Sequence, residues 1–131
     1  MENIQFDSGM QCFRVNEKGV LRFNPADPNV YVRFQQALES LQQLEQDMAA
    51  EVTNGADFLQ VLARTDKAIK QNLNLVFGPG NDFDALVGGV NLLSAGADGK
   101  TVAEHLFAAL EPVLVAGAKR CAQAQAATIS Q

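Results

Sequence analysis

The segment SAGADGKT, residues 94–101, has residue types that occur in phosphate-binding loops, because it ends in Gly99-Lys100-Thr101. In such a loop, backbone N–H groups surround the phosphates and the lysine side chain reaches them. The motif also needs a glycine at the position of Ser94 and a strand before it, whereas the preceding residues have helical character. A turn at Asp98-Gly99 followed by a helix cap at Thr101 explains the same residues. Nucleotide binding at 94–101 is therefore the less favoured alternative.

No other group of residues has a spacing typical of catalysis or metal binding. His105 is the single histidine, and its neighbours complete neither a metalloprotease motif nor a catalytic triad. Cys12 and Cys121 stand far apart beside apolar residues, which is typical of reduced, packed thiols. Most of the remaining acidic residues stand at predicted helix starts, where capping explains them. The sequence predicts no catalytic residue, no metal site and no cofactor.

The charge and hydropathy of the chain argue against two classes of partner. The formal net charge is −5 and the pI is about 4.7, and an acidic chain is repelled by nucleic acid and by anionic lipid. No apolar run has the length that spanning a bilayer requires. The N-terminal residues MENIQFDSG are polar and acidic, unlike a signal peptide. We expect a soluble, intracellular protein that binds neither nucleic acid nor membrane.

The segment CFRVNEKGVLRF, residues 12–23, predicts a β-hairpin because apolar and polar residues alternate on both sides of a turn. A loop at Glu17-Lys18-Gly19, with Gly19 left-handed, pairs Val15 with Leu21 and Phe13 with Phe23. This register places those four side chains on one face and sets Arg14 opposite Arg22 on the other. A further short strand at Ile4–Phe6, before a turn at Asp7-Ser8-Gly9, extends the sheet.

Two amphipathic helices are predicted next, over about 28–51 and 56–77. Asp27 is a good N-cap for the first of them, and Pro28 fits its first position. Gly78-Pro79-Gly80 stops the second helix.

Two further helices follow in the C-terminal half. A shorter helix begins at Asn81-Asp82 and is weakened by Gly88-Gly89. Another begins at Thr101, which opens a capping box, and we expect a kink before Pro112.

The predicted fold is a single α+β domain that is mainly α-helical. It has a β-hairpin region at 1–24, a helical region with a bundle of about four helices at 25–126, and a flexible tail at 127–131. The small, polar residues of the tail are expected to fray.

The segment VFGPGNDFDALVGGVNLLS, residues 76–94, resembles the small tail assembly chaperones of long-tailed bacteriophages and prophages. In that family an apolar-Phe-Gly step, a glycine turn and a second apolar-Phe-Gly step join two helices. Val76-Phe77-Gly78 matches the first step, and Leu86-Val87-Gly88 matches the second with Val87 where the family often has phenylalanine. The segment FRVNEKGVLRFNPADPNVYVRF, residues 13–34, is similar to the opening of a related phage group.

The resemblance covers about residues 5–95 and implies a non-enzymatic assembly factor of the host cytoplasm. Such chaperones are mostly helical, form homo-oligomers, and bind the tape measure protein and the tail tube protein before the tail is complete. A minor structural tail or virion component is the alternative that would remain in particles. The candidate partner-binding residues are Phe77, Phe83, Leu86, Val87 and Leu93. For any single one of them, a core position is the favoured explanation, because apolar stripes at helical spacing usually face the core.

Overall fold

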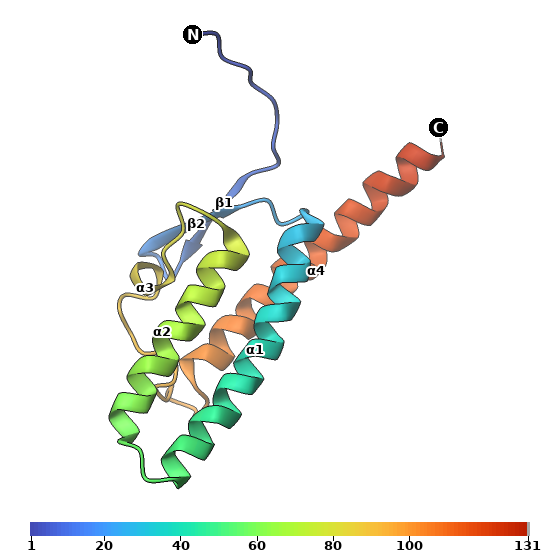
Figure 1. Cartoon of the computed structure of the whole chain (residues 1–131). Coiled ribbons are helices and arrows are strands. Elements are labelled where there is room, and N and C mark those ends of the chain that lie inside the picture. Colours follow the sequence, from blue (N-terminus) through green and yellow to red (C-terminus); the bar gives the residue numbers. More distant parts are fainter. Residues whose placement is uncertain (131) are drawn as a thin grey trace.

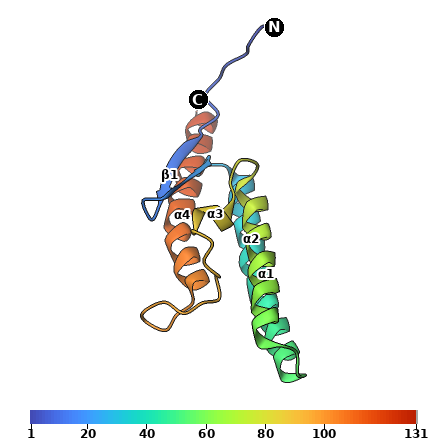
Figure 2. The same cartoon turned by 90° about the vertical axis from the view of Figure 1, so that its left-hand side faces the viewer.

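A computed structural model describes residues 1–130 and confirms the predicted α+β, mainly helical class. Its elements, in chain order, are β1 (Gln11–Val15), β2 (Gly19–Phe23), α1 (Pro28–Thr53), α2 (Phe58–Phe77), α3 (Phe83–Leu86) and α4 (Val102–Ile129). The helices α1 and α2 form an antiparallel pair along most of their length (Figure 1). Figure 2 shows that α4 and the β-hairpin form a second layer beside this pair, with α3 between the layers.

The strands β1 and β2 pair in a register two residues away from the predicted one. The Cα partners are Gln11–Phe23, Cys12–Arg22, Phe13–Leu21, Arg14–Val20 and Val15–Gly19. The predicted pairs Val15–Leu21 and Phe13–Phe23 are therefore wrong, but a two-residue shift keeps each side chain on its predicted face. The shift also moves Arg14 away from the position directly opposite Arg22, where like charges repel.

The residues of the hairpin turn that have a left-handed backbone conformation differ from the predicted one, Gly19. Asn16 and Glu17 have φ angles of 48° and 63°, whereas Gly19 has no positive φ. Gly19 instead packs closely on α3, because a Cβ atom there would lie 2.7 Å from Cδ2 and 3.3 Å from Cα of Leu86. The absence of a side chain at Gly19 thus lets the hairpin lie directly on α3.

The long helices begin at side-chain caps that the sequence indicates. The Asp27 carboxylate accepts from the N–H of Asn29, and the Asp57 carboxylate accepts from Leu59 and Gln60. Each cap satisfies N–H groups that have no partner within the helix. The predicted bounds of α1 and α2 agree with the structure to within about two residues, which is the usual uncertainty of helix ends.

The third helix is shorter than its apolar pattern predicts. Asp82 caps it as expected, but α3 has four residues and ends at Leu86. Gly88 and Gly89 have φ angles of 67° and 74°, so the chain leaves the helical conformation there. Val90 and Leu93, whose spacing would continue the apolar pattern of this helix, lie in the connection between α3 and α4.

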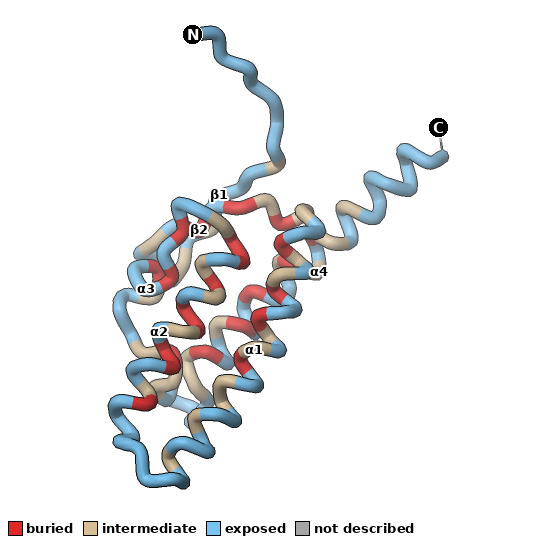
Figure 3. Tube along the Cα trace, viewed as in Figure 1, coloured by how far each residue is buried: buried red, intermediate tan, exposed pale blue. Residues whose placement is uncertain are grey.

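The last helix, α4, continues through Pro112 to Ile129. It therefore includes residues 127–129 of the tail that was expected to fray, whereas residue 131 lies outside the described residues. Gly117 lets α4 pack closely on the backbone before α1, because a Cβ atom at Gly117 would lie 1.7 Å from the carbonyl oxygen of Pro25. Figure 3 shows that the helix beyond this contact is mostly exposed.

The N-terminal residues 1–10, called the arm here, do not form the predicted third strand. The arm is extended, contains no regular secondary structure and runs away from the body of the molecule (Figures 1 and 3). The predicted turn at Asp7-Ser8-Gly9 is nevertheless present, because the Asp7 carboxylate accepts from the N–H of Gly9 at 2.8 Å. The arm leaves four large apolar side chains exposed, namely those of Met1, Ile4, Phe6 and Met10.

The core joins the two layers through a row of phenylalanines. Phe23 of β2 contacts Phe77 of α2 with ring centroids 4.7 Å apart, and Phe77 contacts Phe83 of α3 at 5.3 Å. A separate pair, Phe34 and Phe107, joins α1 to α4 at 5.5 Å. Aromatic pairs at these distances add favourable edge and offset contacts to the area that they bury.

Candidate functional site

The SAGADGKT segment is a closed turn in which several backbone N–H groups already have acceptors within the protein. Gly96 donates to the carbonyl of Lys100, Gly99 donates to the carbonyl of Gly96, and the N–H of Lys100 donates to the Asp98 carboxylate. Thr101 caps α4 by accepting from the N–H of Glu104 at 3.1 Å. A phosphate cradle needs free N–H groups that converge on one point. This geometry agrees with the predicted turn and cap.

His105 is linked to this turn through an exposed hydrogen bond. Its Nε2 atom lies 2.9 Å from Oδ1 of Asp98. The bond to His105, supported by the N–H of Lys100, lowers the pKa of the Asp98 carboxyl below its ordinary value. Both side chains are about half exposed. Their hydrogen bond connects the loop to the first turn of α4.

The five candidate partner-binding residues do not form one exposed patch. Phe77, Phe83 and Leu86 are buried, with exposed fractions of 5%, 1% and 7%. Val87 and Leu93 are half-buried and pack against the same core. The first three thus hold the layers together, and only the last two remain accessible at their edges.

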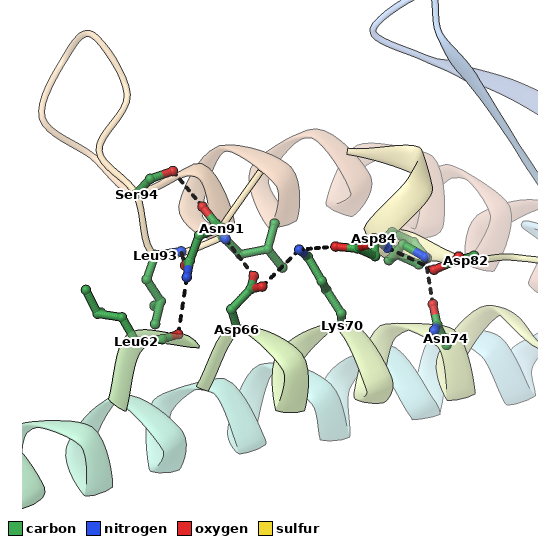
Figure 4. Close-up of polar contacts among 11 residues, drawn as sticks. Leu62, Asp66, Lys70, Asn74, Asp82, Asp84, Asn91, Leu93 and Ser94 are labelled. Atoms are coloured by element: carbon green, nitrogen blue, oxygen red, sulfur yellow. Dashed lines mark hydrogen bonds and ion pairs between the residues drawn. The ribbon is translucent and has the colours of Figure 1, made fainter. Parts of the chain in front are cut away.

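A row of polar groups on α2 holds the segment 78–94 in place (Figure 4). The row recurs every four residues, so all its members lie on one face of the helix. The contacts, in order along α2, are Asn91 Nδ2 to the Leu62 carbonyl at 3.3 Å, the Leu92 N–H to Asp66 Oδ1 at 2.8 Å, Lys70 Nζ to Asp84 Oδ1 at 2.6 Å, and the Phe83 N–H to Asn74 Oδ1 at 2.8 Å. They hold this segment against α2 although α3 has only four residues.

Lys70 is the centre of this row and is buried, with 5% of its surface exposed. Its ammonium group donates to Asp66 at 2.9 Å and to the more exposed Asp84. Burial opposes the charge, but the hydrogen bonds to the two carboxylates outweigh it and raise the pKa of Lys70 above its ordinary value. No buried side-chain nitrogen or oxygen within residues 1–130 lacks a partner.

An apolar cleft of about 330 Å³ opens between the hairpin and α4. Phe13 and Val15 of β1 form one wall, and Val87 and Val90 from the turn after α3 form another. The third wall is the exposed side of the first half of α4. The remaining lining residues are Arg14, Asn16, Leu21, Phe23, Val102, His105, Leu106, Ala109, Leu110 and Val113. The polar lining residues are Arg14, Asn16 and His105, and no acidic side chain is among the lining residues.

Of the residues that line the cleft, only Val87 was predicted from the sequence to bind a partner. The α4 residues that line it have the spacing of an apolar stripe on a core-facing helix, which does not by itself indicate a site. An available signal was the width of that stripe, because Val102, Leu106, Ala109 and Val113 add a second apolar row beside the buried one. A wide apolar face on a helix has more surface than one neighbour covers.

Other kinds of site find no support in the part of the chain that the structure describes. No cluster of three or more histidine, cysteine, aspartate and glutamate side chains could hold a metal ion there. Within residues 1–130, no helix has both the length and the apolar character that a membrane span needs. Cys12 is exposed and Cys121 half-buried, and both are free thiols; the expected packing of Cys12 is therefore wrong.

Comparisons of the chain with protein-family models, with curated proteins and with solved structures found no match.

Proposed function

We propose that this protein is a non-enzymatic tail assembly chaperone of a long-tailed bacteriophage or prophage. It binds tape measure and tail tube proteins in the host cytoplasm before the tail is complete. The proposal starts from the resemblance of residues 76–94, and one structural observation carries it further. Val87 and Val90, which belong to the glycine-rich part of that segment, form a wall of the apolar cleft.

The cleft suits an apolar side chain or the apolar face of a client helix. Open grooves with apolar walls and few polar groups are a common way to hold an amphipathic segment. Shielding such a segment needs no chemical step, which agrees with a chaperone that has no turnover.

The first test is affinity capture of the tagged protein from host cells that are producing phage. Mass spectrometry of the eluate and of purified particles identifies the partners and shows whether this chain stays in the particle. Tape measure or tail tube protein in the eluate, together with absence from particles, supports the chaperone. Presence of this chain in particles supports the structural alternative, and no phage partner in either fraction contradicts both.

Two substitutions locate the client contact on the cleft. Ala109 is exposed on α4 and lines the cleft, so Ala109→Arg places charge there without disturbing the core. Val87→Asp tests the opposite wall. Leu59→Asp is the matched control, because Leu59 is 73% exposed at the start of α2 and lies outside the cleft. Capture that survives in folded Ala109→Arg and Val87→Asp proteins would place the client elsewhere.

A further inference from the structure

The two-stranded sheet has an unpaired edge directly beside the apolar cleft. Within residues 1–130, β1 pairs with β2 alone, so its other edge carries backbone N–H and C=O groups without strand partners. Two-stranded sheets are marginal by themselves, and an open edge is a template for another strand. Because β1 supplies Phe13 and Val15 to the cleft, a strand added at this edge would lie over the cleft.

The arm has the sequence of the strand that this edge lacks. Ile4 and Phe6 are two residues apart and point to the same side of an extended chain. They are 87% and 80% exposed, which is costly for large apolar side chains in water. Added to the β1 edge, the arm would direct both side chains into the cleft.

The root of the arm is held so that it points away from the cleft of its own chain. Asn24 Nδ2 donates to the carbonyl of Ser8 at 3.1 Å, and Asp7 closes a turn at Gly9. Gly9 has a φ of 76°, and a Cβ atom there would lie 2.5 Å from the Asn24 side chain. These contacts direct residues 1–7 into solvent (Figures 1 and 2). The same contacts leave the arm accessible to a second molecule.

The charges of the arm and the cleft are complementary. The arm carries Glu2 and Asp7 and contains no lysine or arginine. The cleft lining contains Arg14 and no acidic residue. Opposite charges favour the encounter and fix the orientation of the inserted strand.

We infer that two copies of this chain exchange arms, each arm pairing with the β1 edge of the other copy and placing Ile4 and Phe6 in its cleft. The exchange is reciprocal, so it closes as a two-fold dimer and leaves no free arm or cleft. It uses only this chain and does not depend on the proposed client. If the cleft also takes a client, arm release precedes client binding, and that consequence alone rests on the proposed function.

Sedimentation of the purified full chain between about 1 and 500 µM tests the dimer. The wild-type chain is expected to form a concentration-dependent dimer, and Phe6→Asp is expected to weaken it by at least about tenfold, because each dimer buries two copies of Phe6. Leu59→Asp introduces the same charge at an equally exposed apolar residue and should leave the dimer unchanged. A monomer at all concentrations, or a dimer that Phe6→Asp does not weaken, would overturn the inference.

Disulfide trapping tests the location in a background with Cys12→Ser and Cys121→Ser. A chain with Phe6→Cys is mixed with a chain with Ala109→Cys and oxidised, so that a cross-link between the two positions must join different copies. We expect a dimer on a non-reducing gel, in clear excess over a mixture of Phe6→Cys with Leu59→Cys. If the two mixtures give equal yields, the arm does not lie in the cleft. If a Phe6→Cys, Ala109→Cys double variant closes only within one chain, the occupant is its own arm, and exchange is wrong.

Discussion

The side-chain amide of Asn81 pairs with the backbone of Arg22 as a neighbouring strand would. Its Oδ1 atom accepts from the Arg22 N–H at 3.0 Å, and its Nδ2 atom donates to the Arg22 carbonyl at 2.9 Å. The same Nδ2 atom donates to the carbonyl of Phe77 at the end of α2. Asn81 is 8% exposed, so one side chain closes the outer edge of β2 and ties it to the last turn of α2.

We predict that Asn81→Asp strongly destabilises the fold. An aspartate keeps the shape and can still accept from the Arg22 N–H, but its carboxylate faces carbonyl oxygens where the amide donated. Leaving buried groups unpaired beside a charge costs about 3 kcal/mol or more of unfolding free energy. Urea denaturation measures this loss. Asn81→Ala removes the bonds without adding charge and should cost less, so equal losses would contradict the explanation.

The buried ammonium of Lys70 gives a second prediction. Lys70→Met keeps the length of the side chain but leaves the Asp66 carboxylate with the Leu92 N–H as its remaining partner. Breaking a buried ion pair in this way costs about 3–5 kcal/mol. Adding Asp66→Asn removes the unpaired charge while an amide oxygen can still accept from Leu92. The double variant should therefore be more stable than Lys70→Met alone, and a further loss would contradict this account.

The ammonium group of Lys70 makes the stability of the fold sensitive to high pH. Because the pKa of Lys70 is raised in the folded state, its contribution is complete below the ordinary lysine pKa of about 10.4. Above that value the unfolded chain loses the proton first, so stability falls as the pH rises toward the folded pKa. Denaturation between pH 9 and 11 should show a steeper loss for the wild type than for Lys70→Met. Parallel curves would mean that Lys70 does not carry the effect.

We predict that Gly117→Ala destabilises the protein although alanine favours helices. Helix propensity alone would stabilise the variant by about 1 kcal/mol. The added methyl group would lie 1.7 Å from the Pro25 carbonyl oxygen, and such overpacking costs about 1–3 kcal/mol once the chains have moved apart. The sign of the change in thermal denaturation separates the two effects. A more stable Gly117→Ala protein would show that α4 does not pack closely on Pro25.

The hairpin turn offers a stabilising change. Glu17 holds a left-handed conformation that costs a side chain about 1–2 kcal/mol. Glu17→Gly creates an Asn-Gly pair, which this kind of turn prefers, and should raise the free energy of unfolding by about 0.5–1 kcal/mol. Glu17→Gln removes the charge alone and is the control. A gain of the same size in that variant would assign the effect to charge.

Local signals made the helices and their caps predictable. Asp27 and Thr101 cap helices through hydrogen bonds to residues two or three positions later, and the sequence contains both partners. The face of the hairpin on which each side chain lies was predictable for the same reason, because side chains alternate between the two faces of a strand. The hairpin register was not, because it follows from a turn centred on Asn16 and Glu17, both left-handed, instead of the predicted loop at Glu17-Lys18-Gly19.

The cleft and the row on α2 depend on how segments meet and were not predicted. Asp66 and Lys70 are four residues apart, which indicates an ordinary surface ion pair on a helix. The structure buries that pair because the connection after α3 crosses over it. In the same way, Phe83 and Leu86 have the pattern of either a core or a surface stripe. Only the placement of α3 between the layers decides that they are core.

The pair of Asp98 and His105 gives a prediction for the loop that resembles a nucleotide site. The hydrogen bond from His105 is the main cause of the lowered Asp98 pKa, so His105→Leu should raise that pKa toward about 3.9 in an NMR titration of the carboxyl carbon. The rise should be incomplete, because the Lys100 N–H still donates to the carboxylate. Lys100→Ala keeps this N–H and should leave the pKa low. A rise in Lys100→Ala equal to that in His105→Leu would assign the shift to the charge of the lysine instead of the bond.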